Sequence, residues 1–338
     1  MALRIVVLGA GLIGGYVGGR LAAAAGDVTF VGRPRLIDVL RDKGLTLTDL
    51  DGARFTLAPE TLSLATEPAA LAAADLILLA VKSTGTEGAA AEIAAHARPG
   101  IPVVSLQNGV SNPERLRALL PGRPVIAGMV PFNVAEPAPG HVHQGTSGHI
   151  AIEDRAEIAP LVPLFAAAGL PLDLHADMLP VAWAKLLINL NNAINALSGL
   201  PLAAQIADRD YRRGFALCQR EALGLMKIAG IAPARLGPLP PSRMPLILSL
   251  PNWLFRRLSQ RGGTPKIDRH ARSSMADDLL AGRKTEVDYI NGEVVALATR
   301  LGRRAPVNAR VIGLIREREA GGPAIQGAAL LAALRGAA

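Results

Sequence analysis

A single lysine among asparagines is the most distinctive chemical feature of the helical pattern at 178–198. Lys185, Asn189 and Asn192 recur at i, i+4 and i+7, so they share one face of that helix. The opposite face is apolar and carries Trp183, Leu187, Leu190, Ile194 and Leu197. A solvated face would normally carry Glu, Arg and Lys, which are better helix formers than Asn. The pattern predicts a cleft wall where burial lowers the pKa of a proton-donating Lys185; the alternative is a surface lysine.

A second group of polar residues lies nearer the C-terminus. Ser274 belongs to a helical pattern that ends at Gly282. Thr285 and Asp288 then fit a capping box, which would place Glu286 in the first turn of the next helix. Two interpretations of Glu286 stay open. It is either a carboxylate directed into the cleft to accept a substrate hydroxyl, or a side chain that complements the helix dipole.

The N-terminal sequence RIVVLGAGLIGG predicts a dinucleotide site. Gly9, Gly11 and Gly14 have G-x-G-x-x-G spacing directly after an aliphatic run and before a helical one. The first glycine allows a tight turn, and the second lets the backbone approach a pyrophosphate at the positive end of the helix. The strand, helix and second strand fit within about thirty residues, as this fingerprint requires. The alternative is a glycine-rich turn with a purely structural role.

The end of the second predicted strand indicates which dinucleotide binds. An NAD site needs an acidic residue there for the ribose 2′-hydroxyl, but this chain has Arg33 and Arg35 in the sequence FVGRPR. A guanidinium matches the geometry of a 2′-phosphate, so the sequence predicts NADPH bound through Arg33. Two solvated surface arginines are the alternative.

The elements that would position these residues divide the chain in two. Strands are predicted at Arg4–Leu8, Val28–Val31, Leu76–Val81, Val103–Leu106 and Val125–Met129. Long helical patterns follow at 178–198, 209–229, 268–281, 286–301 and 307–319. Aliphatic strands that alternate with helices indicate a parallel sheet covered on both faces. We therefore expect an α/β, Rossmann-type doubly wound NADPH domain at 1–175, then a mostly α-helical substrate and dimerisation domain at 176–338.

Three segments do not fit this alternation. The stretch 130–152 resembles a junction, and 232–265 contains seven prolines. We interpret 232–265 as an insertion that covers the helical domain as a hairpin, because internal prolines break an interfacial helix. An amphipathic patch for a membrane surface or a partner is the alternative. The alanine-rich tail from Gly321 is expected to pack loosely.

Composition narrows the function classes. The 338 residues carry a net charge of +8, which favours anionic ligands, but two tryptophans, three tyrosines and six phenylalanines offer few platforms for nucleic-acid bases. The long uncharged stretch 186–207 contains four asparagines and a proline, so it predicts no membrane span. The lone Cys218 is compatible with a reducing cytoplasm, and we expect a cytoplasmic protein that binds neither nucleic acid nor a metal.

Several motifs together resemble those of the ketopantoate reductase family. They are GAGLIGG, Arg33, AVKS around Lys82, QNGV around Asn108, WAKLLIN and SSMADDLLAGRKTEVDYING, and they follow the family order from residue 5 to about 315. The resemblance implies reduction of 2-dehydropantoate (ketopantoate) to pantoate with NADPH, on the route to coenzyme A. The substrate would be a small 2-oxo acid, and the protein is expected to form a homodimer.

The resemblance also implies a role for each residue. Lys185 would be the general acid at the carbonyl oxygen, and Glu286 would hold the substrate hydroxyl and lie near the cofactor. Ser274 would help to bind the substrate carboxylate. Asn108 and Lys82 would lie near the nicotinamide and its ribose, with Asn108 also at the substrate. Asn189 and Asn192 complete the predicted substrate site, which is expected in a cleft between the two domains.

One departure from the family pattern affects the substrate side. The family often has a second asparagine eight residues after the lysine, where this chain has Ala193, and Asn192 is the expected substitute. The long insertion 232–265 is a second departure. An enzyme that reduces another branched 2-oxo acid, a lactone or an imine is therefore the alternative. A non-catalytic NADPH sensor is the alternative from a different class.

Overall fold

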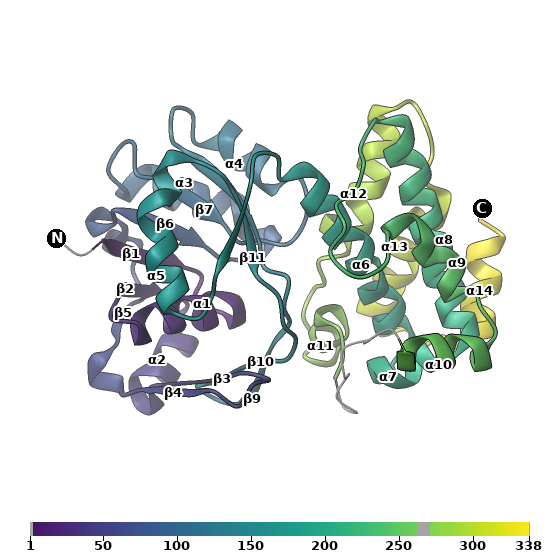
Figure 1. Ribbon diagram of the computed structural model, residues 1–338, viewed down its shortest axis with the longest axis horizontal. Coiled ribbons are helices and arrows are strands. Elements are labelled where there is room, and N and C mark those ends of the chain that lie inside the picture. The colour runs from purple at the N-terminus through teal and green to yellow at the C-terminus, as the bar shows by residue number, and fades with distance from the viewer. Residues whose placement is uncertain (1–2, 262–270, 338) are drawn as a thin grey trace. The chain divides into compact units, whose positions relative to one another are not determined.

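The aliphatic runs predicted as strands form the middle of an eight-stranded sheet (Figure 1). The computed structural model describes residues 3–261 and 271–337 and divides at residue 178 into two units. The strand order in the first unit is β5 (Ser63–Ala65), β2 (Asp27–Val31), β1 (Arg4–Leu8), β6 (Leu76–Leu79), β7 (Val103–Ser105), β8 (Val125–Met129), β11 (Ile150–Glu153) and β12 (Leu172–His175). The first six strands in this order are parallel, whereas β11 is antiparallel to β8.

Both faces of this sheet are buried. Ile5 and Val7 of β1 pack in one core cluster, whereas Val6 and Leu8 pack in another. The first cluster receives side chains from α1 (Leu12–Ala23), α2 (Pro34–Lys43) and α5 (Val162–Ala167). The second receives them from α3 (Thr86–His96) and α4 (Asn112–Leu119). Burial on both faces explains why the central strands are continuously aliphatic, and the doubly wound α/β fold is confirmed.

The stretch 130–152 is not a junction, because it folds into the first unit. It contributes β9 (Val134–Ala138) and β10 (His141–Gln144), which join β3 (Leu45–Thr48) and β4 (Arg54–Leu57) in a second, four-stranded sheet. It also contributes most of β11 to the main sheet. Pro137 lies in β9, an edge strand, where a missing backbone donor is tolerated. These short, partly polar strands lack the aliphatic runs that revealed the central ones.

The second unit is helical, as predicted, and α6 (Leu179–Ser198) forms much of its core. The predicted stripe Trp183, Leu187, Leu190, Ile194 and Leu197 is buried throughout. Around α6 pack α8 (Arg209–Ile228), α11 (Ser274–Leu280), α12 (Val287–Arg300) and α13 (Pro306–Glu319), and the short α7 (Leu202–Ala207) precedes α8. These helices confirm the predicted patterns except at 268–281, where residues 271–273 are not helical, α11 begins at Ser274, and residues 268–270 lie outside the described ones.

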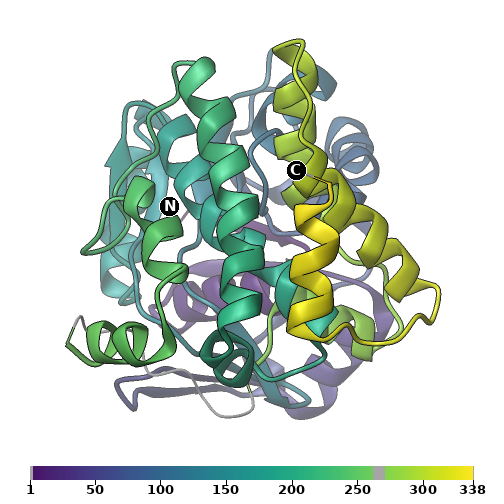
Figure 2. The ribbon, with the colours of Figure 1, turned by 90° about the vertical axis from the view of Figure 1, so that its right-hand side faces the viewer.

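Two peripheral segments of the helical unit, the C-terminal tail and the predicted insertion, form helices beside α8. The tail was expected to pack loosely, but α14 (Gly327–Arg335) lies along α8 and buries Leu330 and Leu334 (Figure 2). Gly214 of α8 allows this approach, since a Cβ there would lie 3.3 Å from Leu334. Within 232–265, α9 (Met244–Leu248) also packs on α8, and α10 (Asn252–Arg261) follows. Residues 262–265 of the predicted insertion lie outside the described ones.

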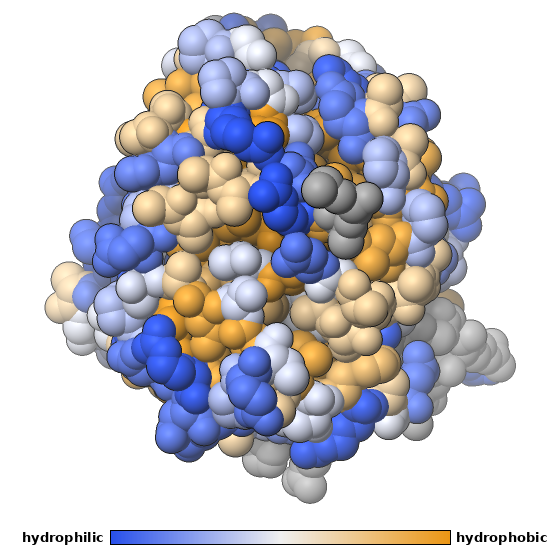
Figure 3. Space-filling model, turned by 90° about the vertical axis from the view of Figure 1, so that its left-hand side faces the viewer, coloured by the Kyte–Doolittle hydropathy of each residue, from blue (hydrophilic) through white to orange (hydrophobic). Residues whose placement is uncertain are grey.

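The surface of the first unit is mixed in character. On the face that Figure 3 presents, hydrophilic and hydrophobic side chains are interspersed. Scattered apolar side chains on a surface are normal and need no special explanation. No helix within residues 3–261 and 271–337 has both the length and the hydropathy required to span a membrane.

Candidate active site

The glycine loop after β1 has the tight geometry that the fingerprint predicts. Gly9 has φ +100°, and a Cβ there would lie 2.6 Å from the backbone nitrogen of Val81. A Cβ at Gly14 would lie 2.2 Å from the carbonyl oxygen of Gly9, so the loop and α1 can meet only without side chains. Gly11 differs, because no atom lies within 4 Å of its would-be Cβ. It begins α1 beside open space, which is suited to an anion at the helix N-terminus.

The strand order places this loop at a switch point of the sheet. From β1 the chain proceeds outward through β2 and β5, and then returns to β6 on the other side of β1. In open α/β sheets, ligands bind outside the carboxyl ends of the strands where the order reverses. Gly9 follows β1 and Lys82 follows β6, so both lie at this position.

A buried polar network fixes the loops that follow β6 and β7. The Ser83 hydroxyl donates to the carbonyl of Asn108 at 3.0 Å, and the Asn112 amide donates to both the Ser83 hydroxyl and that carbonyl. The Gln107 amide donates to the Thr86 hydroxyl at 2.9 Å. Ser83, Thr86, Gln107 and Asn112 are all buried. The network holds the backbone of Asn108 in place while its side chain stays exposed.

The predicted cofactor residues of the first unit therefore gather at one edge of the sheet, whereas Glu286 belongs to the helical unit. The three glycines follow β1, Arg33 follows β2, Lys82 follows β6 and Asn108 follows β7. Arg33 and Lys82 are exposed, and Arg33 directly precedes α2. The sequence pattern did not predict the hydrogen-bond network around Ser83. Its only sequence signal is the cluster of small polar residues just after two aliphatic strands.

Lys185 lies in the first half of α6, next to buried side chains of the same helix. Val181 and Asn189, one turn to either side, are buried, whereas Ile188 is 53% exposed and Lys185 itself is partly exposed. Desolvation by burial lowers the pKa of Lys185 from 10.5 to about 8. An ammonium group with this pKa is still mostly protonated at neutral pH, yet it releases its proton far more readily than an ordinary lysine.

The asparagines of α6 divide into two groups that the sequence alone did not separate. Asn189 is buried and Asn192 is partly exposed, on the predicted face with Lys185. The other two are structural. Asn191 exchanges two hydrogen bonds with Gln205 at 3.2 Å, and Asn195 donates to the carbonyl of Leu200.

Ser274 is exposed at the start of α11, directly after the residue that caps this helix. The cap is Ser273, whose buried hydroxyl accepts from the backbone of Ala276 and donates to the carbonyl of Asn192 at 3.0 Å. Ser273 therefore ties the start of α11 to the asparagine-rich part of α6. The structure thus brings Ser274 to the neighbourhood of Asn192 in the helical unit.

The predicted capping box at Thr285 and Asp288 is wrong. The backbone N–H and the hydroxyl of Thr285 both donate to the Glu319 carboxylate at 2.8 Å, and Asp288 instead pairs with Arg316 at 2.8 Å. The Glu319 carboxylate of α13 accepts the Thr285 N–H that the Asp288 side chain would accept in a capping box, while the Thr285 hydroxyl accepts from the backbone N–H of Val287. Glu286 consequently precedes the first residue of α12, where it is 7% exposed.

The strand order, the glycine loop and the helical second unit define an α/β protein with a Rossmann-type domain followed by a helical domain. Residues 5–157 match the family profile "Ketopantoate reductase PanE/ApbA", and residues 177–319 match that of its C-terminal part. The chain therefore belongs to the ketopantoate reductase family of oxidoreductases, as its motifs indicated.

Individual relatives agree with this assignment. The chain is 29% identical to a 2-dehydropantoate 2-reductase of Pyrococcus horikoshii, over 94% of this chain and 98% of the relative. A PanE/ApbA family ketopantoate reductase from Ralstonia eutropha JMP134 superposes with a TM-score of 0.79 at 29% identity, over 94% and 99% of the chains. D-mandelate dehydrogenase with NADH and anilino(oxo)acetate has a TM-score of 0.78 at 18% identity, over the same shares, and so shares the fold.

Proposed function

We propose that this protein reduces 2-dehydropantoate to pantoate with NADPH, and that Lys185 protonates the carbonyl oxygen. The main support for this proposal is the pKa of Lys185, which burial lowers to about 8, on a helix within the region that matches the family profile. Hydride transfer to a ketone builds negative charge on oxygen. A positioned acid at that oxygen typically accelerates such a step by about 10²–10⁴-fold.

The residues of the first unit fit a nicotinamide dinucleotide. The open space beside Gly11 can accept the pyrophosphate. A larger side chain at position 11 would occupy this space and prevent the backbone from approaching the pyrophosphate. Arg33 would hold the 2′-phosphate, while Lys82 and Asn108 would contact the ribose and the nicotinamide. When bound, NADPH supplies the hydride.

The helical unit would bind and orient the 2-oxo acid. In this proposal Ser274 binds the carboxylate, Glu286 accepts the substrate hydroxyl, and Asn189 and Asn192 complete the site. The low exposure of Glu286 supports this role, because a hydrogen bond to a buried carboxylate is stronger than one in water. The predicted cleft, the homodimer and the cytoplasmic location stay predictions.

A second candidate is the reduction of a different 2-oxo acid. Ala193 departs from the family pattern on the substrate side, and D-mandelate dehydrogenase shows that the same fold accommodates anilino(oxo)acetate. Both candidates use the same proton donor. They differ in whether the enzyme reads a hydroxyl group of the substrate.

Steady-state NADPH oxidation with ketopantoate and its analogue lacking the 4-hydroxyl separates the two candidates. Glu286→Ala should raise KM for ketopantoate by about 10- to 100-fold, as expected for a lost charge-assisted hydrogen bond, and should affect the deoxy analogue less. Asp288→Ala, two residues away at an exposed ion pair, is the matched control. Equal losses for both substrates would show that Glu286 does not read the hydroxyl.

A further inference from the structure

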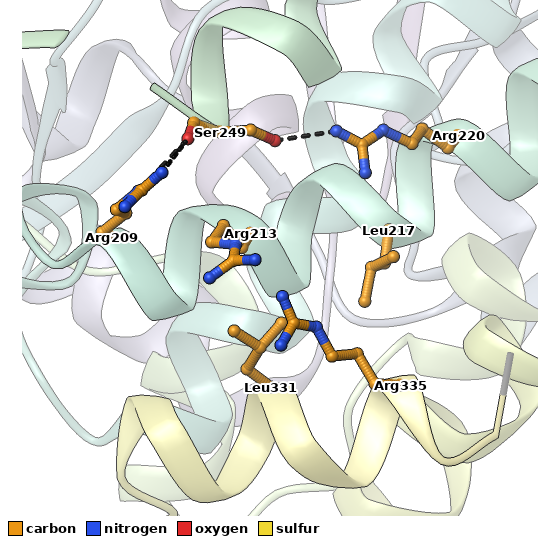
Figure 4. A pocket seen from close by; sticks show the side chains of 7 residues that line it. All are labelled: Arg209, Arg213, Leu217, Arg220, Ser249, Leu331 and Arg335. Carbon is orange, nitrogen blue, oxygen red and sulfur yellow. Dashed lines mark hydrogen bonds between the residues drawn. The ribbon is translucent and has the colours of Figure 1, made fainter. Parts of the chain in front are cut away.

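A pocket in the helical unit is lined by four arginines that the proposed reaction does not use. It has a volume of about 190 Å³ and lies where α8, the end of α9 and α14 meet (Figure 4). Arg209, Arg213 and Arg220 come from α8, and Arg335 comes from α14. None of these residues belongs to the first unit, which carries the glycine loop.

The arrangement on α8 is electrostatically unfavourable without a ligand. Arg209 and Arg213 are four residues apart on one helix face, and like charges at this spacing repel each other and destabilise the helix. Within the part of the chain that the structure describes, none of the four arginines forms an ion pair with a carboxylate. Four neighbouring cations therefore share one pocket without acidic partners among these residues.

Two of the four guanidinium groups are held in position by the last turn of α9. Arg209 donates through Nε and Nη2 to the carbonyl of Ser249 at 3.2 Å. Arg220 donates through Nη2 to the Ser249 hydroxyl at 2.8 Å and to the carbonyl of Pro245 at 3.3 Å. These contacts use only some of the five N–H donors that each guanidinium carries. The remaining donors are available to a ligand.

The other two guanidinium groups approach from opposite sides of the pocket. Figure 4 shows Arg213 reaching from α8 and Arg335 from α14, with Leu331 beside Arg335 on the same helix. No hydrogen bond within the described residues engages either guanidinium. Leu217 and Leu331 supply the apolar part of the lining, beside Arg209, Arg220 and Arg335, which are exposed residues.

We propose that this pocket binds a phosphate-bearing anion with two or more negative charges. Planar guanidinium groups match phosphate oxygens bidentately, which lysines would not do. Two pre-positioned cations and two unengaged ones suit a ligand with several phosphate oxygens, such as pyrophosphate. The ligand is either a free anion or the headgroup of a lipid, and both sources present the same chemistry to the arginines.

Calorimetric titration with inorganic pyrophosphate tests the site. Because the glycine loop also attracts pyrophosphate, the titration is run in the Gly11→Val background, in which the open space of the loop is filled. Arg213→Gln and Arg335→Gln should each weaken binding by about 10- to 100-fold. Arg213→Lys should retain part of the affinity. Arg304→Gln, an exposed charge elsewhere in the same unit, should change it less than twofold.

Sedimentation with vesicles distinguishes the two sources of phosphate. Binding to phosphatidylcholine vesicles that contain phosphatidic acid, abolished by Arg213→Gln, would assign the site to a lipid headgroup. Pyrophosphate binding without sedimentation would assign it to a free anion. The proposal is overturned if neither probe binds, or if Arg213→Gln and Arg304→Gln weaken binding equally. These binding readouts do not depend on the reductase activity.

Discussion

At the scale of single residues, the chemistry proposed for this protein depends on one partly desolvated lysine. Lys185→Ala should lower kcat by about 10²–10⁴-fold and leave NADPH affinity unchanged, because the glycine loop and Arg33, which would hold the phosphates of the cofactor, lie in the other unit. Lys227→Ala, at the exposed end of α8, is the control for a lost lysine. Steady-state kinetics and a fluorescence titration with NADPH measure the two quantities separately. A kcat within a few-fold of the unmodified enzyme would reject Lys185 as the acid.

The pKa of Lys185 also predicts a pH profile. The proton donor must be protonated, so kcat should fall as pH rises through about 8. An ordinary lysine would place this limb above pH 10. The residual activity of Lys185→Ala should lack the limb. If the variant keeps the same limb, another group is responsible for it.

Our proposal assigns the preference for NADPH over NADH to a different residue, Arg33. Arg33→Ala should weaken NADPH binding by about 10- to 100-fold and leave NADH binding unchanged, because only NADPH carries a 2′-phosphate. Arg35→Ala, an exposed arginine two positions along, is the matched control. Equal losses for both cofactors would show that Arg33 does not contact the 2′-phosphate.

At the scale of elements, the sequence predicts what local patterns determine and misses what tertiary partners determine. The strands β1, β6 and β7 could be found because burial on both faces makes them continuously aliphatic. The strands β9 and β10 carry polar residues and could not be distinguished from a loop. The glycine loop was found because its spacing is set by close backbone contacts, which are a local requirement.

The difference between local patterns and tertiary partners also explains which residues of the candidate site could be predicted. Lys185 stood out because its helix face is otherwise made of short amides. The structural role of Asn191 depends on its partner Gln205, which belongs to another helix, α7. The pattern of residues on α6 alone could therefore not show which asparagines are structural. Similarly, the capping box failed because Glu319 of α13 satisfies Thr285.

The Glu319 contact gives a prediction about the position of Glu286. Glu319→Ala removes the acceptor for two Thr285 donors, and unsatisfied buried donors cost about 1–3 kcal/mol each. The start of α12 should loosen, so KM for the 2-oxo acid should rise several-fold more than kcat falls. Glu319→Gln should restore part of the loss. Glu317→Ala, which breaks only an exposed pair with Arg310, should leave KM unchanged. An equal KM in both alanine variants would contradict this positioning role.

At the scale of the whole molecule, the unfolding of the helical unit can be followed by itself. The chain has only two tryptophans, Trp183 and Trp253, and both belong to the helical unit. Trp183 is fully buried two residues before Lys185, whereas Trp253 is 67% exposed. The loss of the Trp183 signal in denaturant therefore reports unfolding of the helical unit alone.

This signal can test whether the proton donor is held at the expense of stability. Because burial lowers the pKa of Lys185 to about 8, the folded unit binds this proton less tightly than the unfolded chain does. Below pH 8 both states are protonated, and the folded state carries the full desolvation cost. Between about pH 8 and 10.5 only the unfolded chain keeps the proton, so the cost declines as pH rises.

Lys185→Met should therefore stabilise the helical unit at pH 7, by about 1–3 kcal/mol in the free energy of unfolding, while removing the activity. This gain in stability should shrink as pH rises from 8 to 10.5, because the folded protein then loses the Lys185 proton and no longer carries the desolvation cost of the charged lysine. Urea titrations of tryptophan fluorescence at pH 7 and pH 10 measure this difference, with Lys227→Met as the control. A gain that is the same at both pH values would attribute the effect to packing, and a loss at pH 7 would show that the lysine is not under desolvation.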